Sequence, residues 1–284
     1  MSGIVVASVF GGIGNQLFCW AAAHAAAQRS GLDFAVERSS FDRDPLGRSY
    51  LLPGLGIEGL RESPYSALES LAVRGLTRLA DRNRGYIGVA GCSVYTDPRG
   101  ALNRVLLERR LTGRCYLRGY WQSDRYFREF RGELRQAVKL QPCSANPAGA
   151  DEVCVHIRSY KEETAPSRVR LEKDYYHAAY ARCRERLSHP RFVVYSDDLQ
   201  WAKAKDLLPA EYEPGGNEHA PGCNAHDLCD LVAMSRFQNL VIANSSFSWW
   251  AAYLGDAGAW VQAPAAARGC WSSEDPLPAE WDEV

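Results

Sequence analysis

The sequence predicts an α/β protein made of two Rossmann-like domains. Short apolar runs alternate with helical stretches in both halves of the 284-residue chain, most regularly in the second half. This alternation indicates βαβ units and parallel sheets, because parallel neighbours need a long crossover that is usually helical. A stretch with two prolines and several small residues, 141–150, separates the halves. We therefore expect one domain over residues 1–145 and another over 146–284, facing each other across a cleft.

The expected elements follow from apolar periodicity and flanking turn residues. In the first half, strands are expected at 4–9, 33–37 and 115–118, and helices at 16–29, 64–79 and 123–140. A glycine-rich turn, GGIGNQ, joins the first strand to the first helix. In the second half, strands are expected at 153–157, 192–195 and 239–243, and helices at 173–187, 198–208, 225–236 and 247–254.

Bulk composition excludes several classes of function. Apolar residues make up 46% of the chain and charged residues 24%, as in an ordinary globular protein. The net charge of −1 gives no electrostatic reason to expect nucleic acid as a partner. No apolar run approaches the ~18–20 residues of a membrane span. We therefore expect no integral membrane segment, while peripheral membrane association stays open.

The beginning of the chain and the cysteines indicate a cytoplasmic protein. The stretch MSGIVVASVFGGIGNQLF has no basic residues ahead of its apolar run, so no secretory signal peptide is expected. Nine scattered cysteines without a C-x-x-C pair are typical of a reducing compartment. One group, His219, Cys223, His226 and Cys229, holds zinc-ligand side chains, but its spacing matches no standard zinc module. We interpret it as a polar loop entering a helix and expect no metal site.

Polar side chains accompany the ends of three strands of the second half. His156 and Arg158 lie at the end of the first, on one side of the strand by period-two alternation. Asp197 and Asp198 follow the second. The third is followed by Asn244, Ser245, Ser246, Phe247 and Ser248, where a helix is expected to begin. Ligands of open parallel sheets bind beyond the carboxyl ends of the strands, so we expect these groups to share one site.

These groups suit a nucleoside diphosphate. Arg158 offers a planar fork for phosphate, and Asp197 and Asp198 can accept hydrogen bonds from a base or a ribose. Ser246 lies near a helix N-terminus, where unpaired N–H groups bind anions. For any one of these residues, a purely structural role as a helix cap or ion-pair partner is an equal alternative. Their occurrence at three successive strand ends favours a binding site, whereas the following pair of tryptophans is expected in the core.

The glycine-rich turn in the first half is a weaker signal. Gly12 and Gly14 follow a strand and open a helix, as in a dinucleotide-binding turn, and Glu37 lies about where a ribose-binding carboxylate would. Leu17 occupies the place of the third glycine, and its side chain would hinder close packing of helix on strand. We interpret the turn as a tight loop whose backbone and Asn15 face the cleft.

Six stretches occur in this order along the chain: GGIGNQLFCWAAAHA, FDRDPLGR, YLRGYWQSDRYF, VHIR, YSDD and NSSFSWWAAYL. Together they resemble the bacterial α-1,2-fucosyltransferases of glycosyltransferase family 11, and the resemblance spans residues from about 3 to 255. The resemblance implies a GT-B-like fold and inverting transfer of fucose from GDP-fucose to a glycan hydroxyl, such as the 2-hydroxyl of a galactoside. It also implies no metal or other cofactor, with the donor bound by the C-terminal domain and the acceptor by the N-terminal one.

The resemblance further implies roles for single residues. The H-x-R motif ends in Arg158, which would hold the β-phosphate. Asp197 or Asp198 would contact guanine or ribose, and the serines of the S-F-S motif would meet the diphosphate. Asn15 and Gln16, in the glycine-rich turn, would face the reacting centre.

One stretch departs from the family pattern. The H-x-R motif usually continues R-G-D-Y, whereas Ser159, Tyr160 and Lys161 follow here. Lys161 could supply a positive charge but not the bidentate geometry of an arginine. This departure leaves the acceptor and the donor sugar open.

The catalytic base is also left open. Acceptor activation needs a weak base, and Glu162 and Glu163 are the carboxylates nearest in sequence to the expected donor site. Asp42 and Asp44 in the first domain are the alternatives. Two other functions stand beside glycosyl transfer: an NAD(P)-dependent sugar-nucleotide oxidoreductase that uses the glycine-rich turn, and a non-catalytic nucleotide-sugar binding protein.

Overall fold

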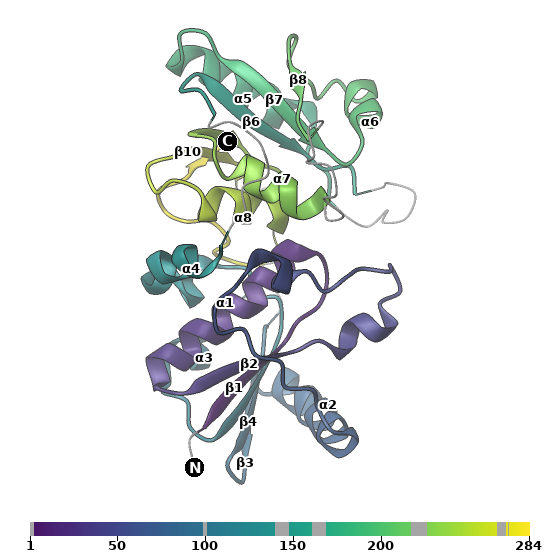
Figure 1. The fold of residues 1–284 in the computed structure, drawn as a ribbon, viewed down its shortest axis with the longest axis vertical. Helices are drawn as coiled ribbons and strands as arrows, with labels where there is room; N and C mark the ends of the chain where they lie inside the picture. Colours follow the sequence, from purple (N-terminus) through teal and green to yellow (C-terminus); the bar gives the residue numbers. More distant parts are fainter. Residues whose placement is uncertain are drawn as a thin grey trace. The chain divides into compact units, whose positions relative to one another are not determined.

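The structure is a computed structural model that describes residues 3–98, 101–139, 148–160, 169–216, 226–265, 271 and 273–284. The chain forms two compact units (Figure 1). The first comprises Met1–Lys139 with Ser272–Pro276, and the second comprises Leu140–Trp271 with Leu277–Val284. The expected boundary at 145/146 lies outside the described residues. A short segment near the end of the chain thus belongs to the first unit, which no sequence pattern indicated.

The sheet of the first unit has five strands in the order β2-β1-β5-β4-β3. The bounds are β1 Ile4–Ser8, β2 Asp33–Glu37, β3 Tyr86–Val89, β4 Cys92–Thr96 and β5 Arg114–Arg118. Four strands are parallel, as expected, but the edge strand β3 is antiparallel to β4. The reversal comes from the two-residue turn Ala90-Gly91, in which both residues have positive φ, 44° and 80°. Such a turn matches the twist of a hairpin, so the expected parallel sheet carries one antiparallel edge strand.

Two long helices cover this sheet. Helix α1, Ile13–Ser30, packs on β1 and β2 and ends at Gly31, whose φ of 66° is in the left-handed region. Helix α2, Ala67–Arg82, packs on β3 and β4. Its first turn closes in a capping box, because the Ser66 side chain accepts from Glu69 N while Glu69 accepts from Ser66 N. The first unit also contains α3 Arg104–Glu108 and the 3₁₀ helices η1 Ser39–Arg43 and η2 Leu52–Leu55.

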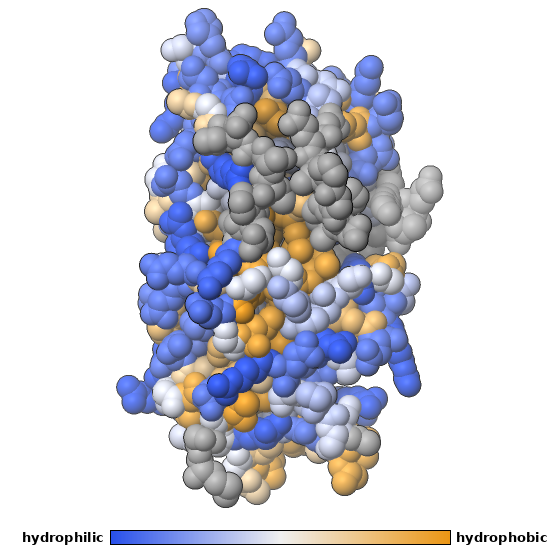
Figure 2. Space-filling model, in the orientation of Figure 1, coloured by the Kyte–Doolittle hydropathy of each residue, from blue (hydrophilic) through white to orange (hydrophobic). Residues whose placement is uncertain are grey.

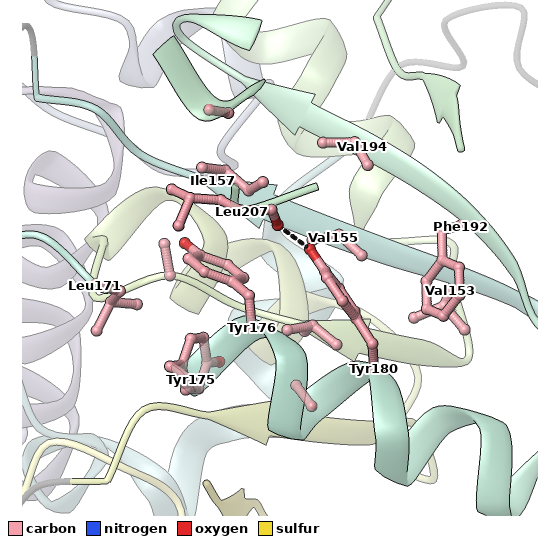
Figure 3. Packing of buried hydrophobic residues seen from close by; sticks show 14 of the residues in the cluster. Val153, Val155, Ile157, Leu171, Tyr175, Tyr176, Tyr180, Phe192, Val194 and Leu207 are labelled. Atoms are coloured by element: carbon pink, nitrogen blue, oxygen red, sulfur yellow. Dashed lines mark hydrogen bonds between the residues drawn. The ribbon is translucent and has the colours of Figure 1, made fainter. Parts of the chain in front are cut away.

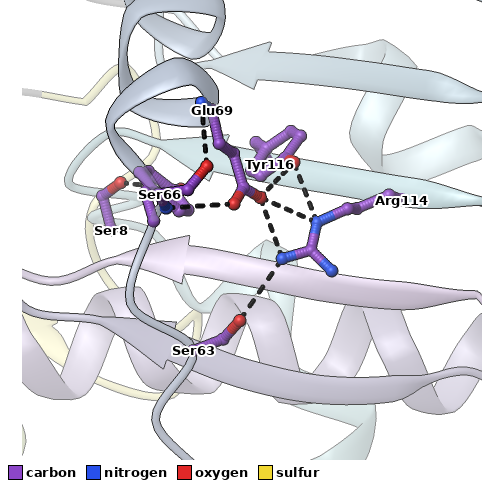
Figure 4. A network of polar contacts seen from close by, with 7 residues as sticks. Ser8, Ser63, Ser66, Glu69, Arg114 and Tyr116 are labelled. Atoms are coloured by element: carbon purple, nitrogen blue, oxygen red, sulfur yellow. Dashed lines mark hydrogen bonds and ion pairs between the residues drawn. The ribbon is translucent and has the colours of Figure 1, made fainter.

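A polar network joins the first turn of α2 to the sheet (Figure 4). The guanidinium of Arg114, on β5, donates through Nε to Glu69 Oε1 at 2.9 Å. The hydroxyl of Tyr116 donates to the same oxygen at 2.5 Å, and Arg114 Nη2 reaches Ser63 Oγ at 3.3 Å. Glu69 is therefore turned toward the sheet and neutralised there.

The single helix expected at 123–140 is instead three short pieces. These are η3 Asp124–Tyr126, η4 Arg128–Phe130 and α4 Arg131–Ala137. The break falls at Phe127, which has a non-helical backbone (φ −151°, ψ 8°) and a fully buried side chain. The neighbouring Tyr126 hydroxyl accepts a hydrogen bond from Asn103 N at 2.7 Å. Packing of these two rings outweighs the helical propensity of the segment.

The second unit contains a six-stranded sheet in the order β11-β10-β9-β6-β7-β8, and all its pairs are parallel. Its strands are β6 Glu152–Ile157, β7 Arg191–Ser196, β8 Glu213–Pro214, β9 Asn239–Val241, β10 Trp260–Ala263 and β11 Asp282–Glu283. Its helices are α5 Lys173–Arg186, α6 Leu199–Ala204, α7 His226–Met234 and α8 Ser246–Leu254. The three central strands and all four helices were expected. The short outer strands β8, β10 and β11 were not.

Three tyrosines of α5 fill the core of the second unit, and two of them also hold the ends of strands (Figure 3). The Tyr180 hydroxyl donates to Leu207 O at 2.7 Å. The Tyr175 hydroxyl donates to Ile242 O, just beyond β9, at 2.6 Å, and that of Tyr176 donates to His156 O on β6 at 3.3 Å. Buried hydroxyls are thus satisfied by backbone at the ends of β6 and β9. The core fixes the strand ends that carry the predicted site.

Among the described residues, no helix is both long and apolar enough to cross a membrane.

Candidate functional site

The predicted polar groups of the second unit come together at one edge of its sheet. Strand β6 lies between β9 and β7, and all three run in the same direction. Their carboxyl ends therefore meet side by side, with Arg158 after β6, Asp197 after β7 and Asn244 after β9. This is the edge at which open parallel sheets bind ligands.

Arg158 and Asp197 form an ion pair across two of these strand ends. Arg158 Nε lies 3.5 Å from Asp197 Oδ2, and the other carboxylate oxygen accepts from Ser159 N at 2.7 Å. The Arg158 side chain is 40% exposed, whereas that of Asp197 is 11% exposed. The carboxylate thus sits beneath the guanidinium and orients it, while the guanidinium still reaches solvent.

Tyr160 connects the end of β6 to the end of β9. Its φ of 56° is in the left-handed region, and its hydroxyl donates to Asn244 O. The Arg158 guanidinium carbon lies 5.7 Å from the centre of the Tyr160 ring, within range of a cation–π contact. Arg170 Nε donates to Ser159 O at 2.7 Å. Sequence reasoning gave Tyr160 and Arg170 no such role, because Tyr160 bonds to a residue 84 positions away and Arg170 to one 11 positions away.

Asp198 has a structural role. Its Oδ1 accepts from Trp201 N at 2.8 Å, which makes it the N-cap of α6. Of the two aspartates expected to meet guanine or ribose, one caps a helix and the other holds Arg158. One oxygen of each carboxylate accepts from a backbone N–H group, whereas Asp197 Oδ2 has the ion pair with Arg158 but no hydrogen bond.

The N-terminus of α8 is capped by Ser245, whose side chain accepts from Phe247 N at 3.3 Å. Ser246 is the first helical residue and is half-buried. Ser248 is fully buried, and its hydroxyl lies 3.4 Å from both Ala243 O and Ser245 O. Ser248 therefore points into the protein, and only Ser246 and backbone N–H groups are placed to meet an anion.

Three buried polar atoms at this edge lack a hydrogen-bond partner among the described residues. They are His156 Nδ1, Asn244 Oδ1 and Asp197 Oδ2, the last of which has only the ion pair with Arg158. The Asn244 amide nitrogen donates to Val169 O at 2.9 Å, and the His156 ring lies 5.6 Å from that of Phe247. Burial, reinforced by the charge of Arg158, lowers the pKa of His156 to about 3. A bound ligand can supply the hydrogen bonds that the neutral imidazole and the amide oxygen lack.

The tryptophans that follow are part of the core, as expected. Trp249 and Trp250 are 1% and 0% exposed. Trp249 stacks on Tyr253 with ring centres 4.6 Å apart. They anchor α8 and offer no surface to a ligand.

In the first unit, the glycine-rich turn is held by Gln16. This residue is fully buried, donates to Gly11 O and Ser49 O at 2.9 Å each, and accepts from Leu51 N at 2.9 Å. Its side chain is therefore occupied by backbone rather than turned to a substrate. Asn15 is half-buried and accepts from Gln122 Nε2 at 2.8 Å.

The two turn glycines of the first unit differ in exposure. Gly12 is the exposed N-cap of α1, and a Cβ there would meet nothing within 4 Å. Gly14 is buried in the first turn of α1. Leu17, in place of a third glycine, is fully buried. Glu37 is also buried and accepts from Ser39 N at 2.6 Å, so its carboxylate is turned to its own loop rather than to a ribose.

Several residues expected at the site cannot be placed. Lys161, Glu162 and Glu163 lie outside the described residues, as do His219 and Cys223 of the cysteine–histidine group. Cys229 is disulfide-bonded, whereas the cysteine pattern predicted a reducing compartment.

Both alternative candidates for the catalytic base lie within the described residues. An oxygen of Asp42 lies 3.9 Å from the Arg38 guanidinium. Asp44 accepts a hydrogen bond from Leu46 N at 2.9 Å and so holds its own turn.

A carboxylate that sequence reasoning missed is Asp97, directly after β4. Its Oδ2 accepts from Trp121 N at 3.0 Å, and burial raises its pKa to about 6. The loop that covers it needs glycine at 119, because a Cβ there would lie 2.2 Å from Asp97 Cβ. The same loop carries Gln122, the partner of Asn15. Asp97 thus belongs to the carboxyl edge of the first sheet, close in structure to the glycine-rich turn.

The family follows from the comparison with known proteins. A family model described as glycosyl transferase family 11 matches residues 109–274, more than half of the 284 residues. The chain belongs to glycosyltransferase family 11. The resemblance of the six sequence stretches is therefore confirmed, and this family 11 protein is an enzyme that transfers a glycosyl group from a nucleotide sugar.

Two Escherichia coli relatives have assigned activities. An α-1,2-colitosyltransferase is 25% identical over 301 residues, which covers 99% of each chain. The O-antigen biosynthesis glycosyltransferase WbnK is 29% identical over 109 residues, 37% of this chain and 35% of WbnK.

Solved structures show the same fold at low sequence identity. The Bradyrhizobium α-1,6-fucosyltransferase NodZ, soaked with GDP-fucose, aligns with a TM-score of 0.53 and 16% identity over 90% of this chain and 93% of NodZ. A mutant of Arabidopsis thaliana FUT1 in complex with GDP aligns with a TM-score of 0.50 and 13% identity over 98% of this chain and 75% of that one. The predicted GT-B-like α/β fold is confirmed.

Proposed function

We propose that this family 11 enzyme transfers fucose from GDP-fucose to a hydroxyl of a glycan acceptor, the 2-hydroxyl of a galactoside. The observation that carries the proposal is the juxtaposition of Arg158, held by Asp197, with the N-terminus of α8 at one sheet edge. The second unit would bind the GDP-sugar, and the first would bind the acceptor. The solved relative NodZ was soaked with GDP-fucose, which supports the choice of donor.

The reaction requires the sugar–phosphate bond to break while GDP gains negative charge. Arg158 would meet that charge with its fork, and the unpaired N–H groups at Ser246 would meet it with the positive end of α8. A new bond then forms between the anomeric carbon and the acceptor oxygen on the opposite face, which inverts the configuration. The acceptor hydroxyl loses its proton to a base or to solvent.

Metal independence is part of the proposal. The two carboxylates after β7 are each engaged by protein donors, Asp197 by Ser159 N and Arg158, and Asp198 by Trp201 N. Arg158 and the positive end of α8 at the same edge would supply the charge that a divalent ion would otherwise supply. We expect transfer to persist in excess EDTA, and a loss that Mn²⁺ or Mg²⁺ restores would contradict this part.

Three carboxylates compete for the role of catalytic base. Glu162 and Glu163 follow the donor-side loop in sequence, and Asp97 lies at the carboxyl edge of the first sheet. A base works best when its pKa lies near the working pH, and burial brings the pKa of Asp97 to about 6. We therefore favour Asp97.

A second donor is supported by one relative. The 25% identical protein that covers 99% of the chain is an α-1,2-colitosyltransferase, and colitose lacks the 3-hydroxyl of fucose. The sequence departs from R-G-D-Y directly after Arg158, on the donor side, and this difference is consistent with a donor sugar other than fucose. GDP-linked colitose is therefore the alternative to GDP-fucose.

The test is a donor and acceptor panel with the purified protein. GDP-fucose and GDP-colitose are each incubated with galactoside acceptors, and products are identified by mass spectrometry and linkage analysis. We expect one donor to give an α-1,2-linked product. Transfer only from a nucleotide other than GDP would contradict the donor, and NAD-dependent oxidation or GDP-sugar binding without transfer would contradict the reaction.

A further inference from the structure

Helix α2 of the first unit has a hydrophobic face that no described part of the protein covers. Its buried side chains, Val73 and Ala80, point at β3 and β4. On the opposite side, Leu68, Leu71 and Leu79 are 82%, 68% and 48% exposed. These leucines recur at helical spacing, so they lie along one face. We call them the α2 leucine face.

Gly75 lies within this face and widens the contact surface. A Cβ at Gly75 would meet nothing within 4 Å, so packing within the described structure does not require glycine there. Glycine in a helix interior is destabilising by about 1 kcal/mol relative to alanine. Leu71, Gly75 and Leu79 line a shallow surface depression together with Arg82. Hydrophobic side chains also show among hydrophilic ones at this end of the first unit, where Figure 1 draws α2 (Figure 2).

The charges around the leucine face are mainly positive. Arg74, Arg78 and Arg82 are exposed along the same helix. Glu69 does not offset them, because it is turned to Arg114 and Tyr116 in the network of Figure 4. Asp81 is the one acidic residue of α2 that stays exposed. The outer side of α2 therefore combines leucines with an excess of arginines.

We propose that the α2 leucine face docks on an anionic lipid surface. Leucines on a helix with flanking arginines suit the boundary of a bilayer, where the apolar side chains enter the acyl region and the arginines meet acidic headgroups. A second copy fits less well, since a two-fold contact through this face would bring Arg78 and Arg82 toward their own copies. The binding is peripheral, since no described helix can span a membrane.

The test is sedimentation of the full chain with vesicles. Vesicles of phosphatidylcholine alone are compared with vesicles that contain roughly one-third phosphatidylglycerol. We expect sedimentation with the anionic vesicles, weakened by salt. Leu68→Gln, Leu71→Gln and Leu79→Gln together should lower partitioning at least about tenfold, because less apolar area enters the bilayer. Arg78→Gln with Arg82→Gln should lower it by about fivefold per arginine and remove the preference for phosphatidylglycerol.

Matched controls change exposed residues elsewhere in the same unit. Leu46→Gln replaces a leucine that is 63% exposed, and Arg104→Gln with Arg110→Gln replaces two exposed arginines. Both controls should sediment like the wild type, and all variants should transfer sugar to a soluble acceptor at the wild-type rate. The proposal is overturned if the wild type stays in solution with anionic vesicles, or if the leucine variants and Leu46→Gln sediment alike. It is also overturned if the leucines instead drive self-association, seen by sedimentation velocity without lipid.

Discussion

The carboxylates of Asp197 and Asp198 are neighbours in the chain but have different tasks. Asp197 holds Arg158 and Ser159 N, whereas Asp198 caps α6. Asp197→Asn keeps an oxygen for Ser159 N but removes the charge that orients the guanidinium. A half-exposed ion pair contributes at most about 1 kcal/mol, so we expect GDP binding to weaken up to about fivefold by calorimetric titration.

Asp198→Asn is the matched control. Asparagine is as good an N-cap as aspartate, so both GDP affinity and the melting temperature should stay at wild-type values. If Asp197→Asn binds GDP as well as the wild type or better, Asp197 merely competes with the diphosphate for Arg158.

His156 makes the stability of the protein depend on pH. Its pKa is about 3 in the folded protein, because of burial and then Arg158, against 6.5 for the free side chain. Between pH 6.5 and about 3, His156 is protonated in the unfolded chain but stays neutral in the folded protein. The contribution of the neutral imidazole is therefore present above pH 6.5 and is lost as the pH falls toward 3, by up to about 1.4 kcal/mol per pH unit.

We expect His156→Gln to lose less free energy of unfolding between pH 7 and pH 5 than the wild type, by about 1–2 kcal/mol in denaturant titrations. The exposed His189 provides the control, and His189→Gln should follow the wild type. Parallel pH curves for His156→Gln and the wild type would mean that the folded protein protonates His156 near its ordinary pKa.

At the scale of elements, two neighbouring serines at the start of α8 have different roles, one in capping the helix and one in binding an anion. Ser245 caps the helix, and Ser246 is its first residue. Ser245→Ala should lower the free energy of unfolding by about 1 kcal/mol. Ser246→Asp places a carboxylate where the helix dipole favours it, so stability should be kept, yet the same charge should repel a diphosphate.

We therefore expect Ser246→Asp to lower GDP affinity at least about tenfold without lowering the melting temperature. Ser246→Ala should bind only slightly more weakly than the wild type, since backbone N–H groups provide most of the anion binding. Normal GDP binding by Ser246→Asp would place the diphosphate away from α8.

Elements were predictable from sequence where the pattern is local. The central strands β6, β7 and β9 have β-branched runs followed by polar residues, and these runs identified the site edge. The β3–β4 hairpin escaped notice because Ala90 occupies a left-handed position that usually takes glycine or asparagine. The broken segment around Phe127 depends on burial of its ring, which a helical period does not reveal.

Within the site, the residue types were predictable but not their partners. The Arg158–Asp197 pair joins positions 39 apart in the chain, and Tyr160 reaches Asn244 at a separation of 84. Such pairs form only when the order β9-β6-β7 is established. For the same reason, the sequence predicted that Ser248 contacts the ligand, although in the fold its hydroxyl points into the protein.

For the whole molecule, the pH dependence of transfer tests which unit supplies the base. If Asp97 accepts the acceptor proton, it must be ionised, so kcat/KM should rise with pH and level off above about 6. Asp97→Asn should lower kcat on the order of 10²-fold and flatten this rise. Asp42→Asn is the matched control and should keep the wild-type profile. A flat wild-type profile, or full activity of Asp97→Asn, would return the role to Glu162 or Glu163.

The central claim is that Arg158, at the strand ends of the second unit, carries the charge of the departing diphosphate. Arg158→Ala tests it most directly, in parallel with Arg125→Ala, which removes a similarly exposed arginine from an ion pair with Asp275 in the first unit. We expect Arg158→Ala to remain folded and to lose at least about 10²-fold in kcat/KM, with Arg158→Lys recovering only part and Arg125→Ala unchanged. A folded Arg158→Ala protein with wild-type kcat/KM would contradict the account.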